Sequence, residues 1–279
     1  MLWTLGDNLA SRRVPRHHPR MNDSIATLLR RRDPDRFLTA LFAPPHRRDA
    51  LFALYAFNYE LARARAVVSE PPLALIRLQW WREVVEGEPR RHEVASPLSA
   101  ALAAGVLDPA RLLPVIEAWE TEAYDDFETT DEWRAWLLRG AGGLAVAAAA
   151  ALGAPAPDLF RRFGAAYGVA GLLRTSGALA AQGRCPLPRD LLARHRLSPE
   201  AFIQDPAAAP AQAALLEVAD LGRALLTEVR NVAVPHVAIA AALPAVLARR
   251  DLRRWPDVAV PRWFGDRLAV TVAGLTGRL

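Results

Sequence analysis

The feature that most limits the fold of this chain is that no stretch alternates apolar and polar residues as a half-buried strand does. Start and stop signals of helices run along nearly the whole sequence instead. Residues 33–34 and 108–109 are both Asp-Pro, an N-cap side chain followed by proline at the first helical position. Residues 129–132 (TTDE) have the form of a capping box before an alanine-rich run that Gly153 ends. This pattern predicts an all-α bundle of roughly ten helices.

The caps and breakers also predict where single helices lie. One helix is expected to end near residue 68, before two consecutive prolines, and a short one is expected to begin after Ser198. The other expected helices include residues 73–86, 130–152, 157–182, 210–231, 235–250 and 261–276.

Residues 21–279 are expected to form one domain. The chain has 279 residues, of which 52% are hydrophobic, so it can bury a large core, and it contains no Gly/Ser-rich linker. Residues 1–20 differ from the rest, because they are polar, arginine-rich and without helical periodicity. We expect them to be a disordered basic arm or an over-long gene start before Met21.

Charge and cysteine content narrow the classes of partner. The net charge is +5, and arginine runs such as residues 30–32, 47–48 and 249–250 form either solvated helix faces or a surface that attracts anionic lipid or diphosphate. Nucleic acid is not expected, because no zinc spacing or RNA-binding aromatic motif occurs. The single cysteine, Cys185, excludes an internal disulfide, and no signal peptide is seen, so the expected location is the cytoplasm, with peripheral contact at the inner membrane. The longest apolar run, residues 142–153, is too short to span a bilayer.

Three stretches carry a more specific signal. They are residues 51–71 (LFALYAFNYELARARAVVSEP), 136–153 (WLLRGAGGLAVAAAAALG) and 165–188 (AAYGVAGLLRTSGALAAQGRCPLP). Their order and spacing resemble the squalene/phytoene synthase family, over about residues 33–195. The resemblance implies a single-domain helical bundle of the isoprenoid synthase type. In enzymes of the family, which join two prenyl diphosphates head to head, it also implies two pairs of aspartates that hold Mg²⁺.

The spacing of such a pair has a physical reason. Residues four apart lie on one face of a helix, so two carboxylates can bind one Mg²⁺ ion, which prefers oxygen ligands. In this chain the first pair falls on Ala62 and Ala66, and the second on Thr175 and Leu179. The nearest acid, Glu60, is two positions from Ala62 and therefore points away from that face.

Other positions of the family pattern are either changed or kept. Tyr59 stands where the enzymes have an arginine, and Gly168 and Gly171 stand where they have polar residues. The residues that match the family are Tyr55, Arg174 and Arg184. All six are expected to line a vestigial pocket. There the two arginines either stay unmatched or pair with acids such as Asp190.

Two functions remain open on this sequence. In the first, the chain is a pseudoenzyme with no catalytic residue, metal or cofactor, which acts as a binding or assembly factor. Within residues 56–87, the stretches AFNYELAR, VSEP and IRLQWWREVVEG resemble the branch of the family that contains a mitochondrial assembly factor of respiratory complex I. The expected partners are therefore a subunit of a membrane complex or a prenyl lipid. In the alternative, the chain is an active prenyltransferase of squalene or phytoene biosynthesis that uses Mg²⁺ through other ligands.

Further features allow a structural or a functional interpretation. The acidic stretch 117–132 is either a metal site or a solvated helix end and loop, and the second is favoured. The Trp80-Trp81 pair fits a core position or a partner surface, with the core favoured. Gly164, together with the glycines at 168 and 171, indicates close helix packing or an open pocket.

Overall fold

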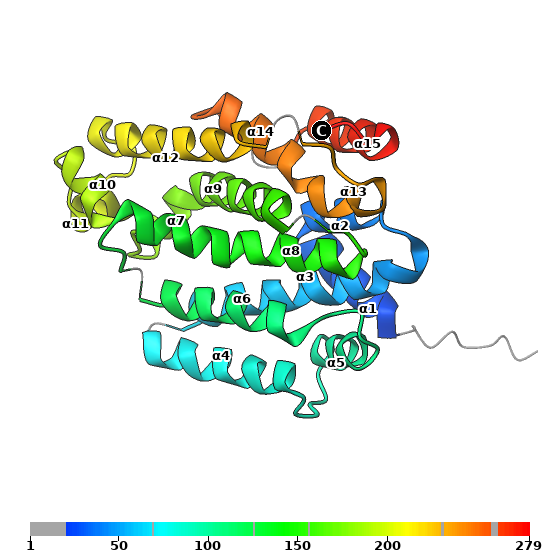
Figure 1. Ribbon diagram of the computed structural model, residues 1–279. Coiled ribbons are helices and arrows are strands. Elements are labelled where there is room, and N and C mark those ends of the chain that lie inside the picture. Colours follow the sequence, from blue (N-terminus) through cyan, green and yellow to red (C-terminus); the bar gives the residue numbers. More distant parts are fainter. Residues whose placement is uncertain (1–20, 69, 125, 156, 230–231, 258–261) are drawn as a thin grey trace, which may run out of the picture.

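The computed structural model describes residues 21–68, 70–124, 126–155, 157–229, 232–257 and 262–279, with the backbone alone for residues 21–23. These residues form fifteen α-helices and one 3₁₀ turn, and none of them lies in a strand (Figure 1). The elements are α1 (Met21–Arg32), α2 (Pro34–Ala40), α3 (Pro45–Ala66), α4 (Pro71–Glu86), α5 (Ala95–Ala103), α6 (Pro109–Glu122), α7 (Thr130–Arg139), α8 (Ala141–Ala151), α9 (Pro157–Ala181), α10 (Arg189–Arg194), α11 (Pro199–Gln204), α12 (Ala209–Thr227), η1 (His236–Ala238), α13 (Ile239–Ala242), α14 (Pro244–Arg254) and α15 (Phe264–Thr276). The expected all-α architecture is confirmed, and residues 1–20 lie outside the described part.

Helix α9 is the centre of the fold. It packs against α7, α8, α12 and α14, while α3 and α6 lie beyond α8, and α4 and α5 form the opposite edge (Figure 1). The core between these layers is apolar, and its largest fully buried side chains include Trp133, Phe57 and Phe160. In the described part, no helix is both long and apolar enough to cross a membrane.

The caps predicted from the sequence are present. The Asp33 carboxylate accepts a hydrogen bond from the backbone N–H of Arg36 at 3.0 Å, at the start of α2. The hydroxyl of Thr129 and the side chain of Glu132 form the reciprocal bonds of a capping box at the start of α7. These bonds satisfy backbone N–H groups that have no partner within the helix.

The structure has more helices than the roughly ten predicted, because two predicted segments are divided and because others, such as α5 and α10, lie outside the predicted segments. The segment 130–152 bends at Gly140, whose ψ of −86° is not helical, so that α7 ends there and α8 begins. A Cβ at Gly140 would lie 2.9 Å from the Cβ of Ala118 on α6, so the bend allows a close approach of the two helices. The segment 235–250 becomes η1, α13 and α14, where Pro244 cannot donate a backbone hydrogen bond.

The glycines of α9 serve two different purposes. A Cβ at Gly164 would clash with the Ala141 carbonyl oxygen, and one at Gly168 would lie 2.7 Å from the Ala141 Cβ. These two positions therefore let α8 and α9 pack closely. A Cβ at Gly171 would meet no atom within 4 Å, so this glycine leaves space open.

The tryptophan pair occupies a core position. Trp81 is buried, and its ring meets Phe57 edge to face at a centroid distance of 5.6 Å. Trp80 is half-buried, and its ring lies 4.8 Å from that of Trp81. The favoured interpretation is thus confirmed for Trp81, while Trp80 lies at the edge of the core.

Candidate functional site

A pocket of about 490 Å³ opens between α3 and α9, with further walls from α6, α7 and α8. This volume is within the range of small-molecule sites, about 300–1,000 Å³. The lining residues are Arg36, Asn58, Ala62, Ala66, Ala118, Trp119, Glu122, Trp136, Leu137, Gly140, Ala141, Tyr167, Gly168, Gly171, Leu172, Thr175, Ala178, Leu179, Gln182, Arg184 and Pro186.

The structure brings the four positions matched to family aspartates into this one pocket. Ala62 and Ala66 line it from α3, and Thr175 and Leu179 line it from α9. Ala66 and Thr175 are exposed, so the pocket is open to solvent at this end. The Thr175 hydroxyl donates to the carbonyl oxygen of Gly171 at 2.9 Å, and is thus engaged within its own helix.

The charges of the pocket are paired across helices. The guanidinium of Arg184 donates to the carboxylate of Glu122 at 2.9 Å, and both side chains are largely buried. The arginines thus pair with acids, as one of the two expectations had it, but not with the example Asp190, whose carboxylate accepts bonds from Thr130 and Arg194. Glu122 reaches Arg184 because α6 ends beside the loop that follows α9.

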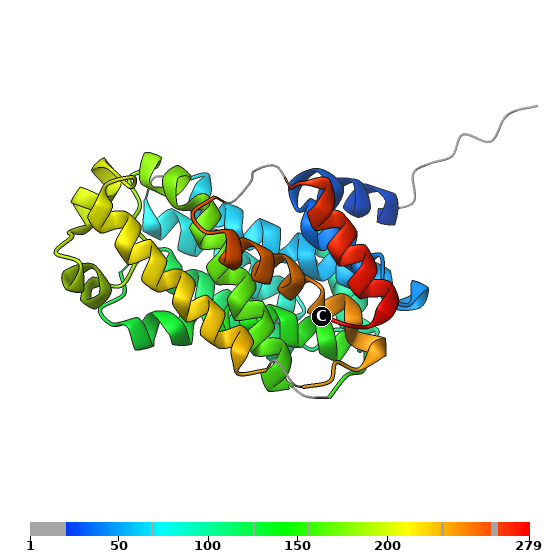
Figure 2. The same ribbon diagram turned by 90° about the horizontal axis from the view of Figure 1, so that it is seen from above.

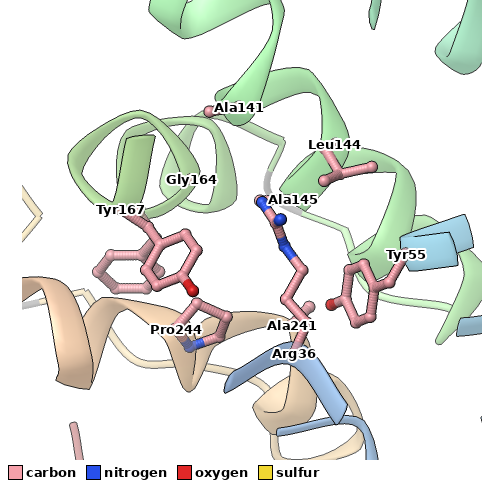
Figure 3. A pocket seen from close by; sticks show the side chains of 10 residues that line it. Arg36, Tyr55, Ala141, Leu144, Ala145, Gly164, Tyr167, Ala241 and Pro244 are labelled. Atoms are coloured by element: carbon pink, nitrogen blue, oxygen red, sulfur yellow. The ribbon is translucent and has the colours of Figure 1, made fainter. Parts of the chain in front are cut away.

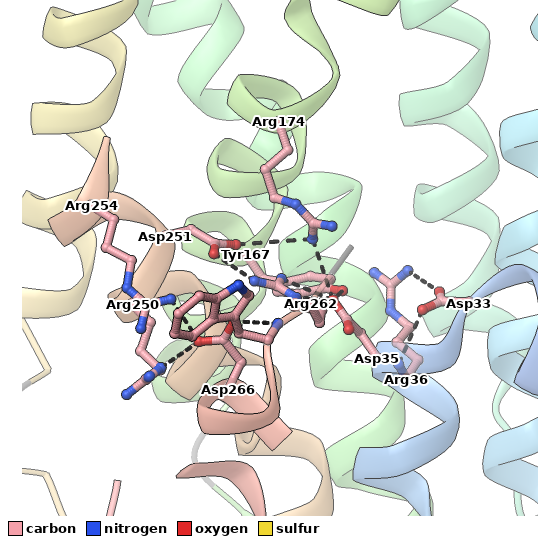
Figure 4. A network of polar contacts seen from close by, with 11 residues as sticks. Asp33, Asp35, Arg36, Tyr167, Arg174, Arg250, Asp251, Arg254, Arg262 and Asp266 are labelled. Atoms are coloured by element: carbon pink, nitrogen blue, oxygen red, sulfur yellow. Dashed lines mark hydrogen bonds and ion pairs between the residues drawn. The ribbon is translucent and has the colours of Figure 1, made fainter. Parts of the chain in front are cut away.

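Arg174 lies outside the pocket, in a buried ionic network that joins α9 to α2 and α14 (Figure 4). The Asp35 carboxylate accepts bonds from Arg174 at 3.4 Å, from the hydroxyl of Tyr167 at 3.2 Å and from Arg262 at 2.9 Å. Arg262 also donates to Asp251. Arg174 is therefore matched by carboxylates and does not leave a free charge at the pocket.

Burial and pairing act against each other in this network. Burial raises the pKa of Asp251, although Arg262 and Arg174 oppose the shift. For Arg262, burial would lower the pKa, but the carboxylates of Asp35 and Asp251 outweigh it and raise the pKa. Arg262 therefore stays positively charged, and together with Arg174 it balances the two carboxylates of Asp35 and Asp251.

Tyr55 lies beside the pocket, in a small adjoining cavity of about 10 Å³ (Figure 3). The guanidinium of Arg36 lies 5.6 Å from the centroid of the Tyr55 ring and 5.1 Å from that of Tyr167. Burial raises the pKa of Tyr55 to about 12, against the effect of Arg36. Arg36 and Tyr167 line both cavities, whereas Tyr55 lines only the small one. Arg36 and Tyr167 therefore form the wall that the two cavities share.

Tyr59 does not line the pocket. Its ring faces the guanidinium of Arg63, at 5.7 Å from the centroid, and Arg63 in turn donates to Glu60 at 2.9 Å. Glu60 is buried, and it is not among the residues that line the pocket. Glu60 therefore does not face the pocket, as its spacing from Ala62 predicts, whereas Tyr59, which was expected in the lining, is absent from it.

Sequence reasoning missed several lining residues. Asn58 accepts a hydrogen bond from the indole N–H of Trp119 at 3.3 Å, and Trp136 donates to the carbonyl oxygen of Ala118 at 2.9 Å. Arg36 pairs with Asp33 at 3.0 Å. Of these contacts, only the Asp33–Arg36 pair could have been expected from the local sequence, because Asp33 is an N-cap residue and Arg36 lies three positions after it.

The donors of this pocket do not fit Mg²⁺ bound to diphosphate, the group that the fold family implies. Mg²⁺ in such a site is usually held by one or two carboxylates together with the phosphates of the ligand. Among the described lining residues the single carboxylate is Glu122, which Arg184 holds. Elsewhere in the described part, no three His, Cys, Asp or Glu side chains converge as metal ligands would. In the acidic stretch, Glu120 pairs with Arg82, and Asp126 pairs with Arg189.

Solved structures share this fold. A dehydrosqualene synthase superposes with a TM-score of 0.72 at 15% identity, over 92% of this chain and 96% of that protein. The squalene synthase HpnC from Alicyclobacillus acidocaldarius gives 0.69 at 19% identity, over 84% and 92%. At these identities the likeness concerns the fold alone.

Sequence comparison adds relatives of a different kind. The chain is 29% identical over 185 residues to the NADH dehydrogenase (ubiquinone) complex I assembly factor 6 of Homo sapiens and to that of Bos taurus. Each match covers 63% of this chain and 56% of the relative, so the chain spans little more than half the length of these proteins. The squalene/phytoene synthase profile matches residues 29–271, which include both walls of the pocket, and the chain therefore belongs to the squalene/phytoene synthase family.

Proposed function

We propose that this chain is a non-catalytic member of its family and acts as an assembly factor for a membrane-bound respiratory complex. The observation that carries the proposal is the pocket, in which Ala62, Ala66, Thr175 and Leu179 occupy the positions matched to metal-binding aspartates. Relatives named as assembly factors of complex I support the choice of partner. The partner would be a subunit of such a complex, met at the membrane surface.

Energetics favour this reading over the alternative of an active prenyltransferase. Metal ions stabilise a departing diphosphate by several kcal/mol. A loss of about 4 kcal/mol from the transition state lowers a rate about a thousandfold. The described pocket offers no second carboxylate that would replace these ligands, because Glu122 is already paired with Arg184.

The assembly role is tested in cells of the source organism that lack the chain. We expect native gels to show less of the assembled NADH dehydrogenase complex, and membranes to oxidise less NADH. Wild-type protein should restore both. Normal assembly in the deletion strain would contradict the proposed role.

The catalytic alternative is tested with purified protein, farnesyl or geranylgeranyl diphosphate, and Mg²⁺. We expect no coupled C30 or C40 product under conditions in which an active squalene synthase gives one. Product formation that depends on this chain would refute its classification as non-catalytic, whatever the result in cells.

The volume and lining of the pocket favour a second candidate, the binding of a prenyl lipid. About 490 Å³ of mainly apolar space suits a prenyl chain with a neutral or weakly anionic head better than a Mg²⁺-diphosphate. We expect farnesol to bind more tightly than farnesyl diphosphate with Mg²⁺. Gly171→Phe should fill the pocket and abolish binding, while Gly177→Phe, which has equally open surroundings but lies outside the lining, should not.

A further inference from the structure

Helix α15 has one face fixed against the protein. Its buried residues are Asp266, Val270, Ala273 and Gly274, and it packs on α14 and α2. Gly274 lies so close to the ring of Phe42 that a Cβ at this position would meet it. The opposite face of the helix must therefore point away from the core.

That outward face is apolar. Phe264 is 78% exposed and Leu275 is 74% exposed, and Leu268 and Val272 between them are half exposed. These residues follow the spacing i, i+4, i+8 and i+11, so they form one stripe along the helix. Trp263, 69% exposed, stands at its start. A solvated helix has polar residues on its outer face, so a continuous apolar stripe marks an interaction surface.

Among the described residues, the exposed charges on and next to α15 are arginines without a carboxylate partner. The one carboxylate of α15, Asp266, is buried and bound by Arg250 at 2.7 Å and by Arg254 at 2.9 Å. Arg267 and Arg278 are exposed, and their side chains form no ion pair with any residue in the described ranges.

Helix α14 adds to this positive field. It lies beside α15 in the same outer layer (Figure 2). Arg249 and Arg253 lie one turn apart on α14 and likewise find no carboxylate partner in the part that the structure describes. Burial and the charge of Arg253 lower the pKa of Arg249, as expected for two neighbouring cations.

We propose that the outer face of α15 is a docking surface for anionic lipid bilayers. Phe264, Leu268 and Leu275 would enter the boundary between headgroups and acyl chains, with Trp263 at the level of the headgroups. Arg267 and Arg278 would contact lipid phosphates. The partner is identified by this combination, because an apolar stripe with a tryptophan at its edge and cations without acids around it matches an anionic membrane surface.

The proposal deepens the proposed function and rests on it for the membrane setting. It gives an assembly factor a defined orientation on the bilayer, with α12, α14 and α15 as the nearest layer (Figures 1 and 2). Vesicle binding is measured with purified full-length protein and separately from complex assembly. A failure of lipid binding and a failure of the assembly role are therefore distinguishable.

The test is co-sedimentation with vesicles of phosphatidylcholine alone and of phosphatidylcholine with phosphatidylglycerol. We expect binding to the anionic vesicles that weakens as salt is added. The variant F264S/L268S/L275S should bind more than about tenfold more weakly, because three large apolar side chains no longer enter the bilayer. R267Q/R278Q should retain apolar insertion but lose most of the preference for anionic vesicles.

A matched control comes from the other side of the molecule. Ile76 on α4 is 66% exposed, so Ile76→Ser removes a comparable apolar side chain far from α15 and should leave vesicle binding unchanged. Thermal melts check that each variant is folded, which is expected because every substituted side chain points outward. Trp263→Phe should remove the blue shift of tryptophan fluorescence that accompanies binding.

Three results would overturn the proposal. Equal binding by wild type and F264S/L268S/L275S would show that α15 is not the docking surface. Equal binding to neutral and anionic vesicles would remove the role of the arginines. Sedimentation as a dimer that the α15 variant converts to a monomer would assign the stripe to a second copy of the chain.

Discussion

Two regions on either side of α9 differ in how many charged side chains they contain. On the side of α2 and α14, the chain buries Asp35, Asp251, Arg174 and Arg262 and pairs them with one another (Figure 4). On the side of α3, the pocket is lined mainly by small and apolar residues, and its Glu122–Arg184 pair is neutral overall. Helix α9 thus has a network of buried ion pairs on one side and an open, nearly uncharged pocket on the other.

This difference indicates which polar groups stabilise the fold. Buried ions are costly unless each is paired, so the network makes the positions of α2, α14 and Arg262 depend on one another. At the open end of the pocket no comparable constraint acts on Ala66 and Thr175, because both are exposed to solvent. The residues at this open end can therefore change without loss of the fold, while those of the network cannot.

The largest effect is expected from removing the cation at the centre of the network. Arg262→Gln leaves the buried carboxylates of Asp35 and Asp251 short of their counterion and should lower the free energy of unfolding by about 3–5 kcal/mol. Urea denaturation at neutral pH measures this. Arg111→Gln removes one partner of an exposed pair with Asp108 and should change stability by less than about 0.5 kcal/mol. Equal effects of the two changes would mean that the buried network contributes no more to stability than an exposed ion pair.

A second prediction concerns the pocket and tests whether carboxylates at its four matched positions would bind Mg²⁺ with diphosphate. The variant A62D/A66D/T175D/L179D should gain binding of Mg²⁺ with diphosphate, and wild type should not. At a ligand concentration of about 100 Kd, binding to the folded chain alone adds about 2.7 kcal/mol of stability, which thermal melts detect. The same four positions changed to Asn provide the uncharged control. No gain in the Asp variant would mean that these positions do not converge on one ion.

A smaller pair of effects separates the packed and open parts of α9. Gly168→Ala should destabilise the chain by about 1–3 kcal/mol, because the new methyl group meets Ala141 at 2.7 Å and Leu137 at 3.1 Å. Gly171→Ala meets no atom within 4 Å and should stabilise the helix by about 0.5–1 kcal/mol. Denaturant midpoints compare the two. Effects of the same sign would show that the pocket closes in solution.

The smallest expected effect is on how the free energy of unfolding depends on pH, through Asp266 next to the network. Burial alone would raise the pKa of Asp266, but Arg250, the backbone N–H of Trp263 and Arg254 outweigh it and lower that pKa. A carboxyl group whose pKa is lower in the folded state adds stability above its unfolded value, about 3.9, and this is lost as pH falls toward the folded value.

The gap in unfolding free energy between wild type and Asp266→Asn should therefore shrink below about pH 4. Denaturation curves at several pH values measure it. A gap that stays constant across this range would mean that the charge of Asp266 does not contribute. The neutral pocket region supplies the comparison, because Gly171→Ala should keep a constant difference from wild type over the same pH range.

Local signals explain why much of the helical structure was predictable. The Asp33 and Thr129 caps depend on groups three residues apart, so the chain specifies them without distant contacts. The convergence of Ala62 and Ala66 follows from helical periodicity, and their meeting with Thr175 and Leu179 was inferred from a resemblance to the family. The break at Gly140 could not be predicted, because its cause is the surface of α6.

Pairings between distant charges were decided by tertiary structure alone. Arg184 meets Glu122 from 62 positions away, and Arg262 meets Asp35 from 227 positions away. An arginine can reach any of several carboxylates, so composition does not select one. From the sequence, Arg174 and Arg184 could either stay unpaired or pair with acids, and no local pattern distinguished these two possibilities.

By itself, then, the chain determined its helices, its family and the residue types at the four matched positions, since these depend on local hydrogen bonding and on periodic burial. Only the tertiary structure decided which polar side chains line the pocket and which apolar stripe of α15 stays outside. Periodicity shows that a helix has apolar faces, but α15 has two of them, at Val270 and Ala273 on one side and Phe264 and Leu275 on the other. The close approach of Phe42 to Gly274 determines which face is buried. Phe42 follows α2 and is far from α15 in the sequence, so the sequence of α15 alone does not show this contact.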